Sequence, residues 1–79
     1  MLTQYIQAAM RHATYEILSN GTFYGEIPGL QGVWANEGAL EACREELQSV
    51  LEDWIIYRLA NNLAIPAVDG VELHVTRAA

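Results

Sequence analysis

One long helical stripe constrains this 79-residue chain more than any other feature of its sequence. Between residues 39 and 62, apolar side chains recur every three or four positions, which is typical of an amphipathic helix that buries one face. Such a helix needs a surface to pack on, and a chain this short has room for one compact domain only. The stripe consists of Leu40, Cys43, Leu47, Val50, Leu51, Trp54, Ile55 and Leu59.

The residues before this helix predict a short helix followed by three strands. Residues 1–12 show helical apolar spacing, with Thr3 available as a cap. Residues 13–35 alternate as a three-stranded antiparallel meander, in which Asn20-Gly21 is the signal of a two-residue hairpin turn. Pro28-Gly29 and Gln31-Gly32 break the chain before a short third strand.

The residues after the long helix predict one more strand. Pro66 is incompatible with a continuing helix, Asp69-Gly70 indicates a turn, and residues 70–76 alternate between apolar and polar. A strand that follows a helical crossover pairs in parallel, with a right-handed connection. We therefore expect a single α+β domain over residues 1–79, in which a mixed sheet of three antiparallel strands and one parallel strand packs on the long helix.

Charge and composition exclude several classes of function. The chain has four basic and ten acidic residues, giving a formal net charge of −6, and all four basic residues are arginines. Without a basic stripe, direct binding of nucleic acid is disfavoured, whereas an acidic surface steers toward a basic partner. The single Cys43 cannot form an internal disulfide, which favours a reducing compartment. The start of the chain lacks a signal peptide and the apolar run Trp54–Tyr57 is too short for a membrane span, so we expect a cytoplasmic protein.

Strand alternation separates two faces of the expected sheet. The face assigned to the long helix holds Tyr15, Ile17, Phe23, Gly25, Ile27, Val33, Ala35, Val71, Leu73 and Val75. The opposite face holds Thr14, Glu16, Leu18, Thr22, Tyr24, Glu26, Trp34, Glu72 and His74. Its mixture of carboxylates and large aromatics has two interpretations: the N-terminal helix folds back across it, or it is a surface for a partner or a second copy.

The sequence offers little support for catalysis or metal binding. Glu16, Glu26 and Glu72 on neighbouring strands could hold a divalent cation or form a catalytic pair, but no acidic motif at diagnostic spacing accompanies them. His12 and His74 are not in metal-ligand spacing. Cys43 lies on the inner stripe of an acidic helix, where a free cysteine acts as a small apolar residue rather than as a nucleophile. We therefore expect no enzymatic activity, no metal and no cofactor.

Residues 23–35 and 39–54 together resemble the HicB-type antitoxin domain. Phe23 or Tyr24 stands at an aromatic position, Gly25 at a small-residue position, and Pro28, Leu30 and Gly32 in the loop that follows. The sequence departs from the family pattern where Gln31 replaces a proline, Val33 a common cysteine and Ala39 a capping residue.

The resemblance implies a partial ribonuclease H-like fold that assembles as dimers or higher oligomers. It also implies a partner, a small basic HicA-type toxin that cleaves mRNA and that the domain masks without catalysis of its own. Many family members continue into a DNA-binding domain, which we do not expect here, so operator binding is not expected either.

Three functional hypotheses remain open. The first is a non-catalytic antitoxin-like module, whose acidic helix and sheet engage the basic toxin. The second is an orphan interaction protein that forms homo-oligomers through the aromatic sheet face. The third is a metal-dependent nuclease that uses Glu16 and Glu72. The residues expected at the partner or oligomer surface are Glu16, Tyr24, Glu26, Trp34, Glu41, Glu45, Glu72 and His74.

Overall fold

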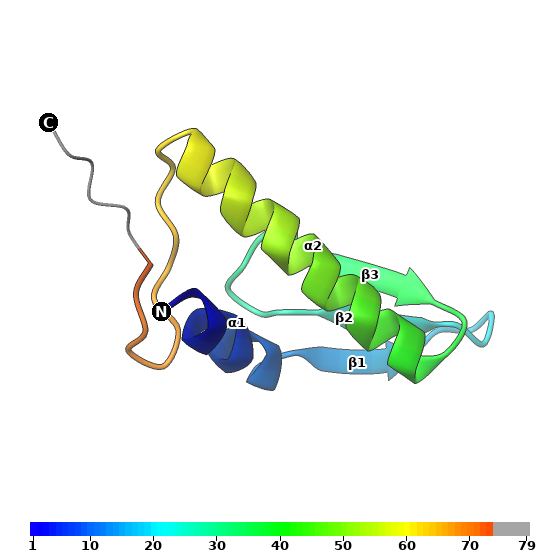
Figure 1. The fold of residues 1–79 in the computed structure, drawn as a ribbon. Coiled ribbons are helices and arrows are strands. Elements are labelled where there is room, and N and C mark those ends of the chain that lie inside the picture. The colour runs from blue at the N-terminus through cyan, green and yellow to red at the C-terminus, as the bar shows by residue number, and fades with distance from the viewer. Residues whose placement is uncertain (74–79) are drawn as a thin grey trace, which may run out of the picture.

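The computed structural model describes residues 1–73, which form two helices and one sheet (Figure 1). The elements follow in the order α1 (Leu2–Arg11), β1 (Thr14–Ile17), β2 (Phe23–Glu26), β3 (Trp34–Glu37) and α2 (Leu40–Ala60). The sheet is antiparallel in the order β1-β2-β3, and α2 runs across one of its faces. The predicted α+β class, the meander and the long helix are confirmed. Thr3, however, does not cap α1, which begins at Leu2 after Met1.

The strand register determines which side chains face α2. Tyr15 lies opposite Gly25, and Gly25 lies opposite Ala35, so these three positions share one face of the sheet. A Cβ atom on Gly25 would lie 2.9 Å from the ring of Tyr15 and 3.1 Å from Sγ of Cys43. The missing side chain at Gly25 therefore lets the Tyr15 ring and α2 approach the middle strand closely.

The core lies between α2, the inner face of the sheet and α1. On α2 the fully buried residues Cys43, Leu47, Leu51 and Ile55 follow one another at intervals of four. Tyr5 and Ala9 of α1 pack into the same cluster, and Ile27, Leu30 and Val33 close it from the loop between β2 and β3. The stripe predicted for the long helix is therefore the one that packs.

Two side chains expected in this core are exposed instead. Ile17 is 69% exposed and Leu40 is 47% exposed. The reason is geometric: α2 lies over β3 and β2 rather than over β1, and it begins only at the end of the sheet. The far end of β1 and the first residue of α2 consequently have nothing to pack against.

The hairpin between β1 and β2 has a three-residue loop rather than the expected two-residue turn. The amide of Leu18 donates to the carbonyl of Thr22, and the amide of Gly21 donates back to the carbonyl of Leu18. Gly21 has a φ of +85°, whereas Asn20 stays at negative φ. This arrangement is that of a three-residue hairpin loop, in which only the last residue takes the left-handed conformation.

The loop between β2 and β3 is made of two consecutive tight turns. The amide of Leu30 donates to the carbonyl of Ile27, and the amide of Val33 donates to the carbonyl of Leu30. Gly29 and Gly32 each occupy the third position of a turn, with positive φ as a type II turn requires. The two breaks seen in the sequence thus form one compact loop, with Leu30 as its buried anchor.

The expected parallel fourth strand is not found in the described part of the chain. After α2, residues 61–73 do not return to the sheet but run beside α1, as the yellow and orange segment of Figure 1 shows. Asp69 and Gly70 both have positive φ and close a tight turn, at which Val68 and Val71 form an isolated antiparallel bridge. This turn lies beside the end of α1 and not at an edge of the sheet. The strand expected over 70–76 is therefore not shown: residues 71–73 form no ladder beyond the single bridge at Val71, and the remaining positions lie outside the described residues.

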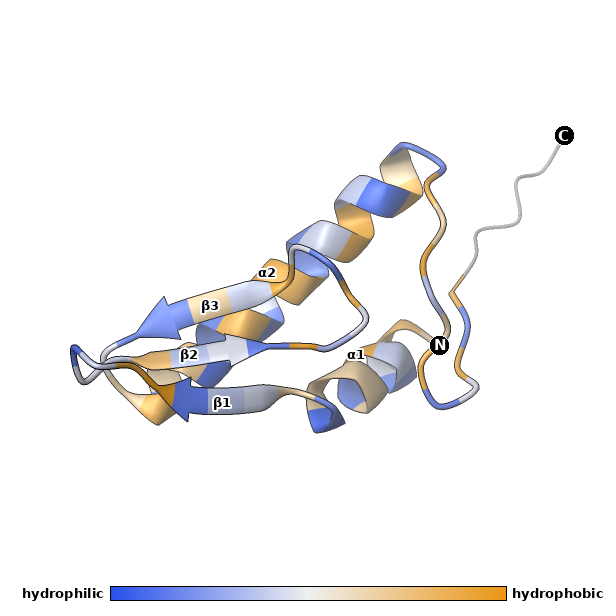
Figure 2. Ribbon diagram, turned by 180° about the vertical axis from the view of Figure 1, so that it is seen from behind, coloured by the Kyte–Doolittle hydropathy of each residue, from blue (hydrophilic) through white to orange (hydrophobic). Residues whose placement is uncertain are grey.

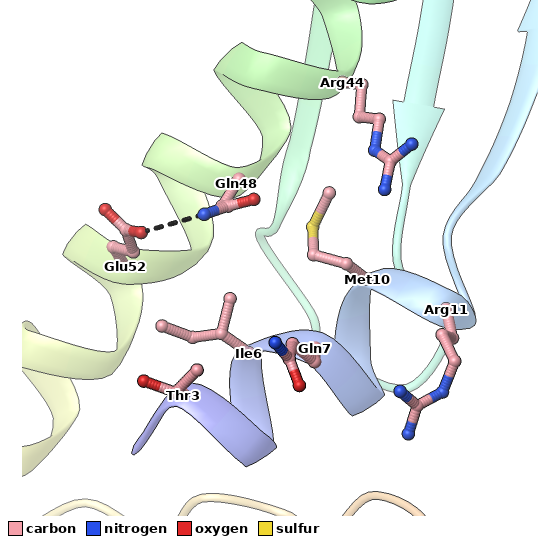
Figure 3. Close-up of a pocket in the computed structure, with 8 residues that line it drawn as sticks. All are labelled: Thr3, Ile6, Gln7, Met10, Arg11, Arg44, Gln48 and Glu52. Atoms are coloured by element: carbon pink, nitrogen blue, oxygen red, sulfur yellow. Dashed lines mark hydrogen bonds between the residues drawn. The ribbon is translucent and has the colours of Figure 1, made fainter.

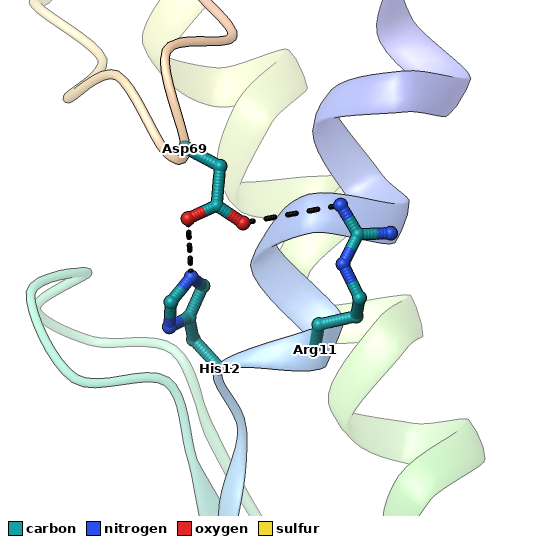
Figure 4. Close-up of polar contacts among 3 residues, drawn as sticks. All are labelled: Arg11, His12 and Asp69. Carbon is teal, nitrogen blue, oxygen red and sulfur yellow. Dashed lines mark hydrogen bonds and ion pairs between the residues drawn. The ribbon is translucent and has the colours of Figure 1, made fainter.

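Polar contacts attach this C-terminal segment to α1. The hydroxyl of Tyr5 donates to the carbonyl of Pro66 at 2.7 Å. His12 Nε2 lies 2.7 Å from one carboxylate oxygen of Asp69, and the Arg11 guanidinium lies 3.9 Å from the other (Figure 4). The predicted turn at Asp69-Gly70 is therefore present, but it presents its carboxylate to the end of α1.

Candidate functional site

The face of the sheet opposite α2, which we call the outer face, is not covered by any described element. Figure 2 views the molecule from this side, with the three strands in front of α2 and α1 beside the sheet. Helix α1 packs against α2 and into the core, which lies on the other side of the sheet from the outer face. The interpretation in which the N-terminal helix folds back across the aromatic face is therefore wrong.

The register arranges six side chains on the outer face in two rows across the strands. One row is Thr14, Glu26 and Trp34, and the other is Glu16, Tyr24 and Asn36. Each aromatic residue thus lies directly opposite a carboxylate on the neighbouring strand. The sequence expectation that Glu16, Tyr24, Glu26 and Trp34 share one surface agrees with this placement.

The two aromatic side chains of this face, Tyr24 and Trp34, stack on each other at the solvent-accessible surface. The rings of Tyr24 and Trp34 lie 6.0 Å apart between centroids, with 24° between their planes. They are diagonal neighbours across β2 and β3, a separation within reach of large side chains. Trp34 nonetheless remains 54% exposed, and an exposed tryptophan of this kind is typical of the centre of a binding surface.

The carboxylates on this face are not neutralised. Glu16 and Glu26 are both exposed, and the ion pairs within residues 1–73 all involve Asp69, which lies at the end of α1 and away from the outer face. Of the three described arginines, Arg11 pairs with Asp69, Arg58 stacks on Trp54, and Arg44 lines a groove between α1 and α2. The outer face therefore presents uncompensated negative charge beside its aromatic pair.

Hydrogen bonds hold the surroundings of the aromatic pair in place. At one end, the side-chain amide of Asn36 donates to Oγ1 of Thr22 at 2.9 Å, and Thr22 in turn donates to Oδ1 of Asn20 at 2.7 Å. At the other end, the indole nitrogen of Trp54 on α2 donates to the carbonyl of Gln31 at 3.1 Å. The end of β3 is thus tied to the hairpin loop, and the loop between β2 and β3 is tied to α2.

Two shallow hollows flank Tyr24 and Glu26. The first lies toward the loop and is lined by Tyr24, Glu26, Trp34 and residues 27–33. The second lies toward β1 and is lined by Thr14, Tyr15, Glu16, Tyr24 and Glu26. Each hollow thus combines an aromatic wall with at least one carboxylate. No sequence pattern predicts the hollows directly, although the paired turns of residues 27–33 are the feature that builds the first.

The other predicted surface residues do not join this site. Glu41 and Glu45 are exposed on α2, which lies on the opposite side of the sheet. Glu72 is exposed in the C-terminal segment, away from the strands, and His74 lies outside the described residues. The proposed grouping of Glu16, Glu26 and Glu72 on neighbouring strands is therefore wrong. Among residues 1–73, no three His, Cys, Asp or Glu side chains gather as a metal site would require.

A further groove, similar in volume to the first hollow, separates α1 from α2 (Figure 3). It has a volume of about 470 Å³, with Ile6 and Met10 on its floor and Arg11 and Arg44 at one end. Some of its polar groups already have partners: Gln48 donates to Glu52 at 3.2 Å, and Arg11 contacts Asp69 outside the groove. The groove therefore offers mixed charge without the convergence of polar groups that marks a ligand site.

Cys43, the one cysteine, is a core residue. It is fully buried, and its Sγ lies 3.6 Å from the carbonyl of Ala35. Burial raises the pKa of the Cys43 thiol, which works against formation of the reactive thiolate. Neither the groove nor Cys43 therefore forms a candidate site, whereas the outer face combines exposed aromatic rings with carboxylates.

The geometry defines a small α+β domain with an open aromatic and acidic sheet face, and the comparisons with known proteins assign its family. The sequence profile of the UPF0150-like family matches residues 4–66, so the chain belongs to this family. The structure is similar to the crystal structure of TTHA0281 from Thermus thermophilus, with a TM-score of 0.90 and 38% sequence identity. That similarity covers 96% of this chain and 95% of the other. Comparison with curated proteins gave no match.

Helix length and polarity also bear on the setting of the protein. Within residues 1–73, no helix combines the length and the apolar character needed to cross a membrane. The 21-residue α2 is long enough, but it carries charged residues along its exposed side.

Proposed function

We propose that this protein is a non-catalytic binding module of the antitoxin type, which acts in the cytoplasm and masks a small basic HicA-type toxin that cleaves mRNA. The observation that carries this proposal is the open outer face, where the stacked Tyr24 and Trp34 stand beside the unpaired carboxylates of Glu16 and Glu26. Aromatic residues are enriched at the centres of protein interfaces, and negative charge selects a basic partner.

The family and the charge of the chain support the same proposal. The UPF0150-like family is related to HicB-like antitoxins. The formal net charge of −6 gives long-range attraction to a basic protein and raises the rate of encounter. A toxin that binds RNA uses cationic side chains for the phosphates, so carboxylates placed on those side chains would block the RNA site.

The proposal predicts that a small basic protein is encoded beside this chain, and binding to that protein tests it. We expect a stable complex at low salt and an affinity that falls steeply between about 50 mM and 500 mM salt, because Coulomb attraction is screened over a Debye length of about 10 Å at 0.1 M. We also expect this protein to stop cleavage of mRNA by the partner. Absence of a complex at low salt, or an affinity that does not respond to salt, would contradict the proposal.

A homo-oligomer that uses the same face without any toxin is the second candidate, because the exposed Trp34 would also suit a second copy. Stacking two outer faces, however, brings Glu16 and Glu26 of both copies together, and like charges across an interface disfavour association. Sedimentation distinguishes the candidates. An oligomer lost in Trp34→Ala supports the second candidate, whereas assembly unaffected by this change leaves the face free for a partner.

A further inference from the structure

We propose that the outer face binds two arginine side chains of its partner, one in each hollow, with Tyr24 and Glu26 shared between them. The inference takes from the proposed function only that the partner is a basic protein. It adds the residue type that is recognised, the number of anchors and their spacing.

The lining of each hollow suits a guanidinium group. In the first hollow, the rings of Tyr24 and Trp34 stand beside the carboxylate of Glu26. In the second, Tyr24 lines the hollow together with Glu16, its partner on β1, and Glu26, two residues along β2. A guanidinium is planar, stacks on aromatic faces and donates two parallel hydrogen bonds to a carboxylate, whereas an ammonium group is a strongly hydrated point charge. Arginine should therefore bind better than lysine.

The molecule contains an internal example of such a contact. On α2, the guanidinium carbon of Arg58 lies 5.0 Å from the ring centroid of Trp54, while Nε of Arg58 donates to the carbonyl of Ala64 at 2.7 Å. The same protein thus already contains an arginine that stacks on an indole ring and donates a hydrogen bond to an oxygen acceptor. Trp34 has the exposed indole and Glu26 the acceptor, but no described arginine occupies the position.

The placement of the hollows predicts how the two arginines are spaced. One hollow is lined by β1 and β2, and the other by β2, β3 and the loop that joins them, so the step from one hollow to the other crosses the strands. Neighbouring strands are about 4.8 Å apart, and residues i and i+2 of an extended segment point the same way about 6.6 Å apart. An extended segment with the pattern Arg-x-Arg, crossing the strands, would place one side chain in each hollow.

The acidic side of α2 does not offer the same combination. Glu41 and Glu45 are exposed one helical turn apart, but the large exposed apolar residues of α2 beyond Leu40 are Ile56 and Tyr57, near its other end. Attraction to α2 would therefore depend on charge alone and would not distinguish arginine from lysine.

Titration of the isotope-labelled full chain with short peptides tests the inference by NMR. The probes are an acetylated and amidated Gly-Arg-Ser-Arg-Gly peptide and its counterparts with lysine or the neutral isostere citrulline at both arginine positions. We expect the arginine peptide to shift the Trp34 indole signal and the amides of Glu16, Tyr24 and Glu26. We expect affinity about fivefold weaker for lysine, and loss of binding for citrulline.

Matched variants locate the binding site. Glu26→Gln removes the charge shared by both hollows and should weaken the arginine peptide about tenfold, whereas Glu45→Gln removes an equivalent charge from α2 and should change affinity by less than about twofold. Both positions are exposed, so an unchanged amide spectrum elsewhere confirms that each variant is folded. Shifts confined to α2, equal effects of the two variants, or equal binding of the citrulline peptide would overturn the inference.

The same variants separate this inference from the proposed function. If the neighbouring basic protein binds the wild type and Glu26→Gln equally well, the arginine site is wrong and the antitoxin proposal stands. If the arginine peptide binds the outer face but the basic protein does not bind at all, the arginine site stands and the antitoxin proposal fails.

Discussion

Among single residues, Gly25 decides how closely the sheet and α2 can approach. A Cβ atom at this position would lie 2.9 Å from the ring of Tyr15 on one side and 3.1 Å from Sγ of Cys43 on the other. Cys43 has little room to move because it is fully buried on α2, and the half-buried ring of Tyr15 would have to turn away from β2. The close packing of three elements at one point therefore depends on a missing side chain.

Gly25→Ala should lower the free energy of unfolding by about 1–3 kcal/mol, since an added methyl group in a packed core forces shifts of its neighbours. Urea denaturation followed by circular dichroism measures the effect. Gly38→Ala is the matched control, because a Cβ there meets nothing within 4 Å. Equal stabilities for the two variants would show that Tyr15 or Cys43 yields without cost.

Among the elements, α2 joins the sheet to α1 through one narrow face. Its buried residues lie on a single line of i, i+4 positions, and the same helix leaves Ile56 64% exposed and Tyr57 62% exposed on its other side. Hydrophobicity alone thus does not indicate which residues of α2 stabilise the fold; their position around the helix does.

Leu51→Ala should lower the free energy of unfolding by about 2–5 kcal/mol, because it leaves a cavity at a fully buried position. Ile56→Ala, further along the same helix, should change it by less than about 0.5 kcal/mol. Thermal and urea denaturation of the two variants side by side measure this contrast. A large effect of Ile56→Ala on stability that depends on protein concentration would instead show that this side of α2 is covered by a second copy.

Across the molecule as a whole, Tyr5 connects α1 to the segment that follows α2. Its side chain is fully buried under α2, and its hydroxyl donates to the carbonyl of Pro66, 61 positions away. Burial raises the pKa of the Tyr5 phenol above its ordinary value of 10.0. The folded state therefore holds the phenol proton more tightly than the unfolded state does.

This linkage predicts how stability falls at alkaline pH. A raised pKa in the folded state contributes stability that is fully present below about pH 10 and is lost as the pH rises through the folded pKa. The free energy of unfolding should thus decrease above about pH 10, and the decrease should be smaller in Tyr5→Phe, which has no proton to lose. Some decrease should persist, because burial also raises the pKa of Tyr15 and of Cys43. Urea titrations between about pH 8 and 11 measure both curves, and identical slopes for wild type and variant would contradict this account.

Local patterns along the chain were enough to predict the helices, the meander and the composition of the outer face. These features repeat at intervals of two or of three to four residues, so near neighbours along the chain are sufficient to indicate them. The sequence alone places Glu16, Tyr24, Glu26 and Trp34 on one face, because alternation along a strand fixes the side to which each residue belongs.

What covers each face, by contrast, is a property of the folded molecule. The exposure of Ile17 depends on where α2 crosses the sheet, and the course of residues 61–73 depends on contacts such as Tyr5 with Pro66 and His12 with Asp69. These contacts join residues far apart in the chain, and no local pattern encodes them. For the same reason, the placement of α1 beside α2, which leaves the outer face uncovered, could be learned only from the fold.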